Sequence, residues 1–280
     1  MILLLKRLLV LVLGIFLAWL TVFTVFPLLD NWMPLAIAIL ITYCLVAYFG
    51  LPALHRFSQI LYKPTHVPTR THSSDGWALD PVNLVVLAQN ENAFVSAMTK
   101  AGWAQADPLN LQSSLKMIRA VVFKKSYPTA PFSNTYAFGR KQNLCFQIEI
   151  DGNPSKRHHV RFWRLGTTIL EDEHEHHGFW HSLISRFNGN KQQIWIGAAS
   201  LETGVNINRY NLQIVHKQEG NTDVERDFLV GTLKDAKVLE DSIGIKASKP
   251  LHTRYQGFRE KIIADGYVTL CQIKSTKKRP

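Results

Sequence analysis

Two long apolar runs at the N-terminus most constrain what this chain can fold into. Residues 8–29 contain 22 residues without a charge, and residues 33–54 form a second uncharged run. A helix needs about 20 mainly apolar residues to cross a bilayer, so each run is long enough to span it. Since only residues 30–32 connect the runs, we expect the two helices to form an antiparallel transmembrane hairpin over residues 1–55.

The charges that flank these runs predict the orientation of the hairpin. Lys6 and Arg7 precede the first run, Arg56 and Lys63 follow the second, and only Asp30 lies between them. Basic residues next to a span favour the cytoplasmic side of the membrane. We therefore expect a multi-pass protein of the bacterial inner membrane with its main domain in the cytoplasm. A cleaved signal peptide is disfavoured, because the first run is too long and no cleavage site follows it.

The remainder of the chain is polar and basic, and it carries nearly all of the formal net charge of +11. Residues 56–79 are rich in Pro, Thr and Ser, which predicts a linker. Residues 80–275 can build a core of their own, and residues 276–280 form a basic tail. A basic domain beside a bilayer faces anionic headgroups. The expected partners are thus the bilayer, through residues 8–54, and anionic lipid or membrane-complex proteins; no recognition motif for nucleic acid is present.

Hydrophobic periodicity predicts an α+β domain that has a mixed or mostly antiparallel sheet and flanking helices. The expected strands are residues 83–89, 135–149, 157–164, 193–201, 205–215 and 267–274. The expected helices are residues 91–102, 111–125 and 222–236. Cys145 and Cys271 fall within strands, and together with Cys44 they have neither the number nor the spacing of a disulfide framework or metal site.

Several motifs follow one another in residues 78–275. They are DPVNLVVLAQNENAFVSAMTKAGW, YPTAPFSNTYAFGRKQNLCFQ, RHHVRFW, IWIGAAS, a lone His216 and TDVERDFLV. This order resembles the LssY C-terminal domain family. The resemblance implies the fold of that family and a membrane context, because in the family this domain often follows membrane segments. It does not imply a reaction.

The first candidate site is the segment RHHVRFWR, residues 157–164. Side chains alternate between the two faces of a strand, so adjacent histidines point apart and cannot share a metal ion. One face carries Arg157, His159 and Arg161, and it could bind an anion because arginine pairs with carboxylate or phosphate. The alternative is an ordinary exposed basic strand that pairs with acids on its neighbour. His158, on the apolar face, is expected to be half-buried with a backbone partner.

The second candidate is the proline-containing loop 127–142. Its prolines fix the backbone, so this loop could present Tyr127, Ser133 and Arg140 to the same anion, with Arg140 in a hairpin turn. The loop could equally be rigid for packing alone. Ser133 lacks the glycines of a nucleophile elbow, and the chain contains no glycine-rich phosphate-binding motif.

The remaining histidines and acids offer a catalytic alternative. His159 or His216 could perform acid–base chemistry with Asp223 or Asp227, which would make the protein a His-dependent hydrolase. A capping box in the sequence TDVE explains Glu225 without any function.

The histidine-rich segment 171–181 is a polar insertion that lacks the HExxH pattern. We therefore predict no metal site and no cofactor, and the alternative is a metal site formed by this segment or by His216 with Asp223 or Asp227.

The leading prediction is a membrane-anchored protein whose soluble domain binds an anionic group, either a lipid headgroup or a carboxylate of a partner. The first alternative is the hydrolase. The second is a structural accessory of a secretion or transport assembly, which would need an exposed apolar patch on the domain.

Overall fold

A computed structural model of the chain describes residues 2–51, 53–54, 70–73, 78–137, 140–165, 192–207, 214–254 and 261–274. The histidine-rich segment 171–181 and the basic tail 276–280 lie outside the described residues, as does most of the predicted linker 56–79.

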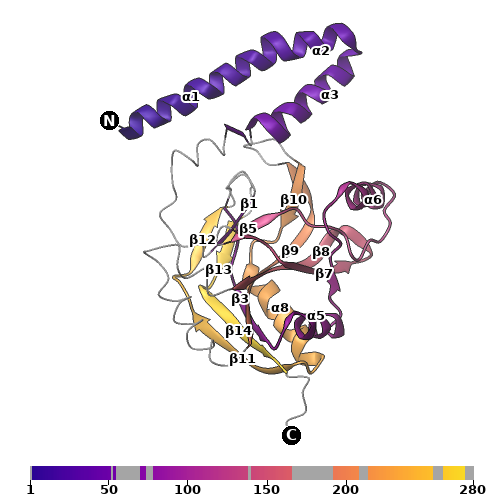
Figure 1. Cartoon of the computed structure of the whole chain (residues 1–280), viewed down its shortest axis with the longest axis vertical. Coiled ribbons are helices and arrows are strands. Elements are labelled where there is room, and N and C mark those ends of the chain that lie inside the picture. Colours follow the sequence, from indigo (N-terminus) through magenta and orange to yellow (C-terminus); the bar gives the residue numbers. More distant parts are fainter. Residues whose placement is uncertain are drawn as a thin grey trace.

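Two apolar helical segments form the N-terminal part of the structure (Figure 1). The first joins α1 (Ile2–Leu20), the π-helical turn η1 (Thr21–Val25) and α2 (Phe26–Trp32), and its part Leu11–Trp32 is long and apolar enough to cross a membrane. The second joins α3 (Leu35–Leu45) and the π-helical turn η2 (Val46–Gly50). At 1.5 Å per residue the second segment reaches about 24 Å, against a hydrocarbon core of about 30 Å. Length and composition therefore mark one helix as a candidate membrane span.

The C-terminal domain is α+β, and its largest sheet has eight strands in the order β11-β14-β3-β9-β8-β7-β4, with β10 paired to β9. The strands are β3 (Leu84–Ala88), β4 (Ala104–Gln105), β7 (Leu144–Ile150), β8 (Asn153–Leu165), β9 (Gln193–Ile207), β10 (Ile214–Gln218), β11 (Leu239–Lys246) and β14 (Tyr267–Ile273). The pair β14–β3 is parallel, and the other described pairs of this sheet are antiparallel. The prediction of a mixed, mostly antiparallel sheet is confirmed.

Two smaller sheets and three helices complete the described part of the domain. The smaller sheets are β2-β1-β5-β6 and β12-β13. Their strands are β1 (Arg70–Ser73), β2 (Ala78–Pro81), β5 (Thr135–Ala137), β6 (Arg140–Lys141), β12 (Leu251–Arg254) and β13 (Lys261–Ala264). The helices are α5 (Glu91–Lys100), α6 (Leu111–Val122) and α8 (Thr222–Asp235). In Figure 1, α6 lies apart from α5 and α8 at the side of the domain.

The large sheet separates two apolar clusters. β3 is buried at all five positions, and its sequence LVVLA is apolar without alternation because both faces are covered. On one face, Phe94 of α5 and Leu229 of α8 join the main core. On the other face a second cluster contains Trp163 and Ile196, with Ala137 of β5. The side chains of β8 are therefore divided between two interiors.

Several element boundaries differ from the prediction. The single strand expected over 135–149 is divided into β5, β6 and β7, and the two strands expected over 193–215 are a continuous β9 followed by β10. The linker expected over 56–79 is wrong at its C-terminal end, where β1 pairs with both β2 and β5. These short pairings bury few apolar residues, so hydrophobic periodicity does not reveal them.

Candidate functional site

β8 places its side chains on alternate faces, as predicted, but both faces are covered. Arg157, His159 and Arg161 are 1%, 0% and 5% exposed. The predicted anion-binding face of this strand is therefore not open to solvent. The alternative, an exposed basic strand paired with acids of its neighbour, is wrong about the exposure. Its pairing describes Arg157, because β9 lies next to β8 and places Glu202 opposite this arginine.

The charges of this strand are compensated within the interior. Arg157 Nε donates to Glu202 Oε2 at 2.6 Å, and its Nη1 donates to Gln147 Oε1 at 2.7 Å. Arg161 Nη1 lies 3.5 Å from Asp80 Oδ2. The carboxylates are each 1% exposed. A buried cation needs such a partner because an uncompensated charge in the interior is very costly.

His159 connects the two ion pairs. Its Nε2 lies 2.7 Å from Arg161 Nη1 and 3.3 Å from Ser200 Oγ, and its Nδ1 lies 3.6 Å from Glu202 Oε1. Arginine can only donate, so we assign Nε2 as the acceptor and place the ring proton on Nδ1, facing Glu202. We call the set Asp80, Gln147, Arg157, His159, Arg161, Ser200 and Glu202 the buried charged network.

Phe132 covers this network. Its ring centroid lies 4.1 Å from Arg157 Cζ, 5.1 Å from Arg161 Cζ and 5.3 Å from the His159 ring centroid. A guanidinium above an aromatic face is attracted by the negative face of the ring. The loop that carries Phe132 is fixed to the sheet, because Gln147 Nε2 donates to the carbonyl of Ala130 at 2.9 Å.

Phe132 also lines a polar recess. This recess has a volume of about 250 Å³. It is lined by Gln105, Ala106, Asp107, Pro108, Leu109, Phe132, Asn134, Lys141, Gln142, Asn143, Leu144 and Cys145. The buried Oδ1 atom of Asn134 has no hydrogen-bond partner among the described residues. Phe132 thus lies beside two buried arginines and also lines the polar recess.

The loop residues predicted for the same site lie in different environments. Tyr127 is buried, and its hydroxyl donates to Asp107 Oδ2 at 2.6 Å. Burial and this hydrogen bond raise the pKa of Tyr127 to about 12. Ser133 and Arg140 are exposed, and the carbonyl of Arg140 accepts from Trp163 Nε1 at 3.1 Å. The structure thus brings Arg157, His159 and Arg161 together, while anion binding by this set and by the loop stays a prediction.

The register of β9 does not bring the two histidines of the catalytic alternative together. His159 pairs with Ser200 of β9, whereas His216 pairs with Val205. These two positions on β9 are five residues apart, which corresponds to about 17 Å along the strand. The backbones of the two histidines are therefore far apart.

Asp223 and Asp227 instead bind Arg226, at 3.2 and 2.9 Å, in a cluster that includes Asp265. Burial raises the pKa of Asp223. Burial acts in the same direction on Asp265, but its hydrogen bond from Arg226 holds the pKa of that carboxyl below its usual value.

The predicted capping box in TDVE is wrong. The N-cap of α8 is Asn221, whose side chain accepts from the amide of Asp223. Glu225 is buried and lies 2.8 Å from His158 Nδ1. The partner of His158 is thus a carboxylate, not the backbone, and its ring stacks on Phe228 at 4.0 Å.

Sequence reasoning missed the partners of the network, which are Asp80, Gln147, Ser200 and Glu202, and it missed Phe132. One signal was available. The run IWIGAASLE predicts a buried strand, and a glutamate that continues such a strand needs a cationic partner. For metals, no group of three or more His, Cys, Asp or Glu in the described part of the chain could hold an ion.

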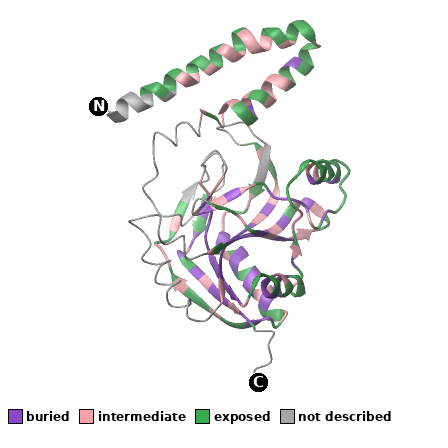
Figure 2. Cartoon of the chain, in the orientation of Figure 1, coloured by how far each residue is buried: buried purple, intermediate pink, exposed green. Residues whose placement is uncertain are grey.

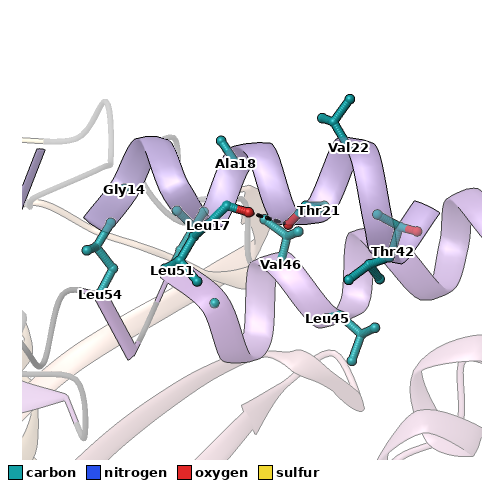
Figure 3. Close-up of a pocket in the computed structure, with 12 residues that line it drawn as sticks. Gly14, Leu17, Ala18, Thr21, Val22, Thr42, Leu45, Val46, Leu51 and Leu54 are labelled. Carbon is teal, nitrogen blue, oxygen red and sulfur yellow. Dashed lines mark hydrogen bonds between the residues drawn. The ribbon is translucent and has the colours of Figure 1, made fainter. Parts of the chain in front are cut away.

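A second cavity, of about 350 Å³, lies between the N-terminal helical segments (Figure 3). Its lining is apolar apart from Thr21 and Thr42, and the Thr21 hydroxyl donates to the carbonyl of Leu17 at 2.8 Å. Among the described residues that line this cavity, none has a titratable side chain.

The structure defines a class of protein in which an N-terminal helix of membrane-crossing length precedes an α+β domain with a mixed sheet. The family model of the LssY C-terminus matches residues 64–268, so this chain belongs to the LssY C-terminus family. The family prediction is thereby confirmed. No curated protein and no solved structure matches the chain.

Proposed function

We propose that this protein is a membrane-anchored binding protein whose C-terminal domain takes up a small anionic group, a carboxylate or a phosphate. The proposed site is the polar recess beside Phe132. The observation that supports it is the position of Phe132, whose ring covers Arg157 and Arg161 and also lines the recess.

The composition of the buried charged network favours a functional role over a purely structural one. Replacing buried ion pairs by apolar residues of similar volume is often neutral or stabilising, so folding alone does not require two buried arginines. Functional sites are places where burial and neighbouring charges are combined in this way.

Arg161 supplies a donor for the proposed ligand. Its Nε atom is buried and has no acceptor among the described residues. A rotation of Phe132 would join Arg161 to the recess, where Lys141 and Asn134 lie on the lining. A carboxylate or phosphate oxygen would then satisfy a donor that is otherwise unpaired.

The test is a thermal unfolding measurement on the full-length protein in neutral detergent. Inorganic phosphate or acetate is expected to raise Tm above its value in chloride at equal ionic strength, because a ligand that binds only the folded state stabilises it by about 2.7 kcal/mol at 100 times Kd. Lys141→Ala and Asn134→Ala should each reduce the rise. Lys249→Ala, which removes an exposed charge outside the recess, should not. Equal Tm values in the three salts would contradict the proposal.

We propose further that both apolar segments insert in the bacterial inner membrane and that the domain lies in the cytoplasm. The flanking basic residues support this orientation. Green fluorescent protein fused to the C-terminus is expected to fluoresce, and alkaline phosphatase at the same position to be inactive, because its disulfides form only outside the cytoplasm. Fusions after Asp30 should show the opposite pattern. Active alkaline phosphatase at the C-terminus would contradict the proposed orientation and place the domain outside the cytoplasm.

The hydrolase alternative has weaker support. Ser200, His159 and Glu202 are aligned in the order of a catalytic triad. However, Arg161 hydrogen-bonds the Nε2 atom that would accept the serine proton, and these three residues are at most 1% exposed. The alignment is better explained as a part of the buried charged network.

A further inference from the structure

The apolar face of α6 points away from the domain. Leu111, Leu115, Ile118 and Val122 follow the spacing of one helix face, and their exposed fractions are 77%, 58%, 59% and 65%. Figure 2 shows that α6 is exposed over most of its surface. We call these four residues the outer face of α6.

The opposite side of α6 holds the helix on the domain. Ser113 and Ala120 are buried, and Met117 packs against the small cluster formed by Ala120, Tyr127 and Ala130. Ser113 also closes a capping box with the N-cap residue Asn110. A surface helix ordinarily turns its apolar stripe toward the core. In α6 the larger apolar side chains are exposed instead, and the contacts of Ser113, Met117 and Ala120 hold the helix with this face outward.

The sequence around the outer face is basic. Lys116, Arg119, Lys124 and Lys125 lie on or directly after α6, and residues 108–148 contain no Asp or Glu. The nearest acids on either side in the sequence are engaged: Asp107 accepts from the Tyr127 hydroxyl, and Glu149 accepts from the Tyr127 amide and the Ser126 hydroxyl. The next acid, Asp151, is exposed. The helix thus has an apolar face with cationic flanks.

We propose that α6 is an interfacial helix, which lies flat on an anionic bilayer with its outer face among the acyl chains. An exposed apolar face with basic flanks is typical of helices that bind the headgroup boundary, and each Lys or Arg there adds attraction to anionic lipid. The chain can place α6 at the membrane. Arg70 follows Leu54 by 16 positions in the sequence, a stretch that reaches about 55 Å at most, and Leu11–Trp32 is a candidate span.

A bilayer fits this face better than a second copy of the chain does. A twofold interface brings the same surface of two copies together. The flanks of α6 would then meet as cation against cation, with no acid of residues 108–148 to compensate. The proposal does not depend on anion binding in the recess, whose lining residues do not include the outer face.

The test measures the depth of a spin label on the full-length protein. Cys44, Cys145 and Cys271 are replaced by alanine, and a nitroxide is attached at Leu115→Cys in phosphatidylglycerol–phosphatidylcholine liposomes. Power saturation then measures how often the nitroxide collides with oxygen, which enters the bilayer, and with a nickel chelate, which does not. The control is Val224→Cys on α8, because Val224 is also apolar and 59% exposed.

At position 115 the nickel accessibility is expected to be severalfold lower than at position 224, and the oxygen accessibility higher. The double variant Lys124→Glu/Lys125→Glu, or liposomes of phosphatidylcholine alone, should remove much of this protection. Lys100→Glu/Lys249→Glu, with the same change of charge at other exposed positions, should not. Equal nickel accessibility at 115 and 224 would overturn the proposal. So would protection that survives the charge reversal, or spin–spin broadening at 115 that reports a second copy.

Discussion

The substitution Glu202→Ala is expected to lower the free energy of unfolding by about 3–5 kcal/mol, because removing one partner of a buried ion pair leaves an uncompensated charge in the interior. Arg157, its partner at 2.6 Å, is 1% exposed, and its Cζ atom lies 4.1 Å from the centroid of the Phe132 ring. The measurement is chemical denaturation of the full-length protein in detergent. Tryptophan fluorescence follows the domain, since Trp163 and Trp195 are buried within it.

Two further variants separate the charge from the change of volume. Glu240→Ala removes an exposed carboxylate that accepts from Gln272, and it should change stability by less than about 0.5 kcal/mol. The double variant Arg157→Met/Glu202→Leu removes both charges and should recover most of the loss. A loss below about 1 kcal/mol for Glu202→Ala, the range of exposed ion pairs, would show that Arg157 is solvated.

Phe94→Ala is expected to cost about 3–5 kcal/mol, the range for deleting a buried aromatic side chain. Phe94 is fully buried, and its ring lies 4.8 Å from that of Phe162, 5.4 Å from that of Trp195 and 5.9 Å from that of Phe146. It therefore connects α5 to three strands of the large sheet. The same denaturation measurement applies, and Phe94→Leu should lose less because the smaller side chain still fills part of the volume.

Leu115→Ala is the matched control for this prediction. Leu115 is also apolar and helical, but it is 58% exposed on α6. Its truncation should change the stability of the detergent-solubilised protein by less than about 0.5 kcal/mol. Similar losses for Phe94→Ala and Leu115→Ala would mean that the outer face of α6 packs against the domain.

The parts of the fold that follow from local periodicity could be predicted. The predicted helices 91–102, 111–125 and 222–236 agree within a few residues with α5, α6 and α8, because their apolar residues recur at helical spacing. The prediction omits β11, because it is mostly exposed and because Asp241 interrupts the apolar alternation of Leu239, Ile243 and Ile245.

The candidate site was only partly predictable, for a physical reason. Alternation along β8 correctly grouped Arg157, His159 and Arg161, but whether such a face meets solvent depends on its neighbours. The compensating carboxylates belong to β2 and β9, far from β8 in the sequence. Ion pairs between strands that are distant in the sequence leave no periodic pattern in either strand, so they cannot be predicted from local periodicity. The orientation of α6 was likewise undetermined, because a stripe on a helix does not specify which way it faces.

The parallel pairing of β14 with β3 has a consequence for biosynthesis. β3 is the first strand of the large sheet and lies between β9 and β14, the last strand described. Translation proceeds from the N-terminus, so β3 emerges from the ribosome long before β14. The edge of β3 (LVVLA) that later pairs with β14 must then remain unpaired while the intervening chain is made. An exposed apolar strand is prone to aggregate. Nascent chains of this protein are therefore expected to need a chaperone until residue 273 has been released.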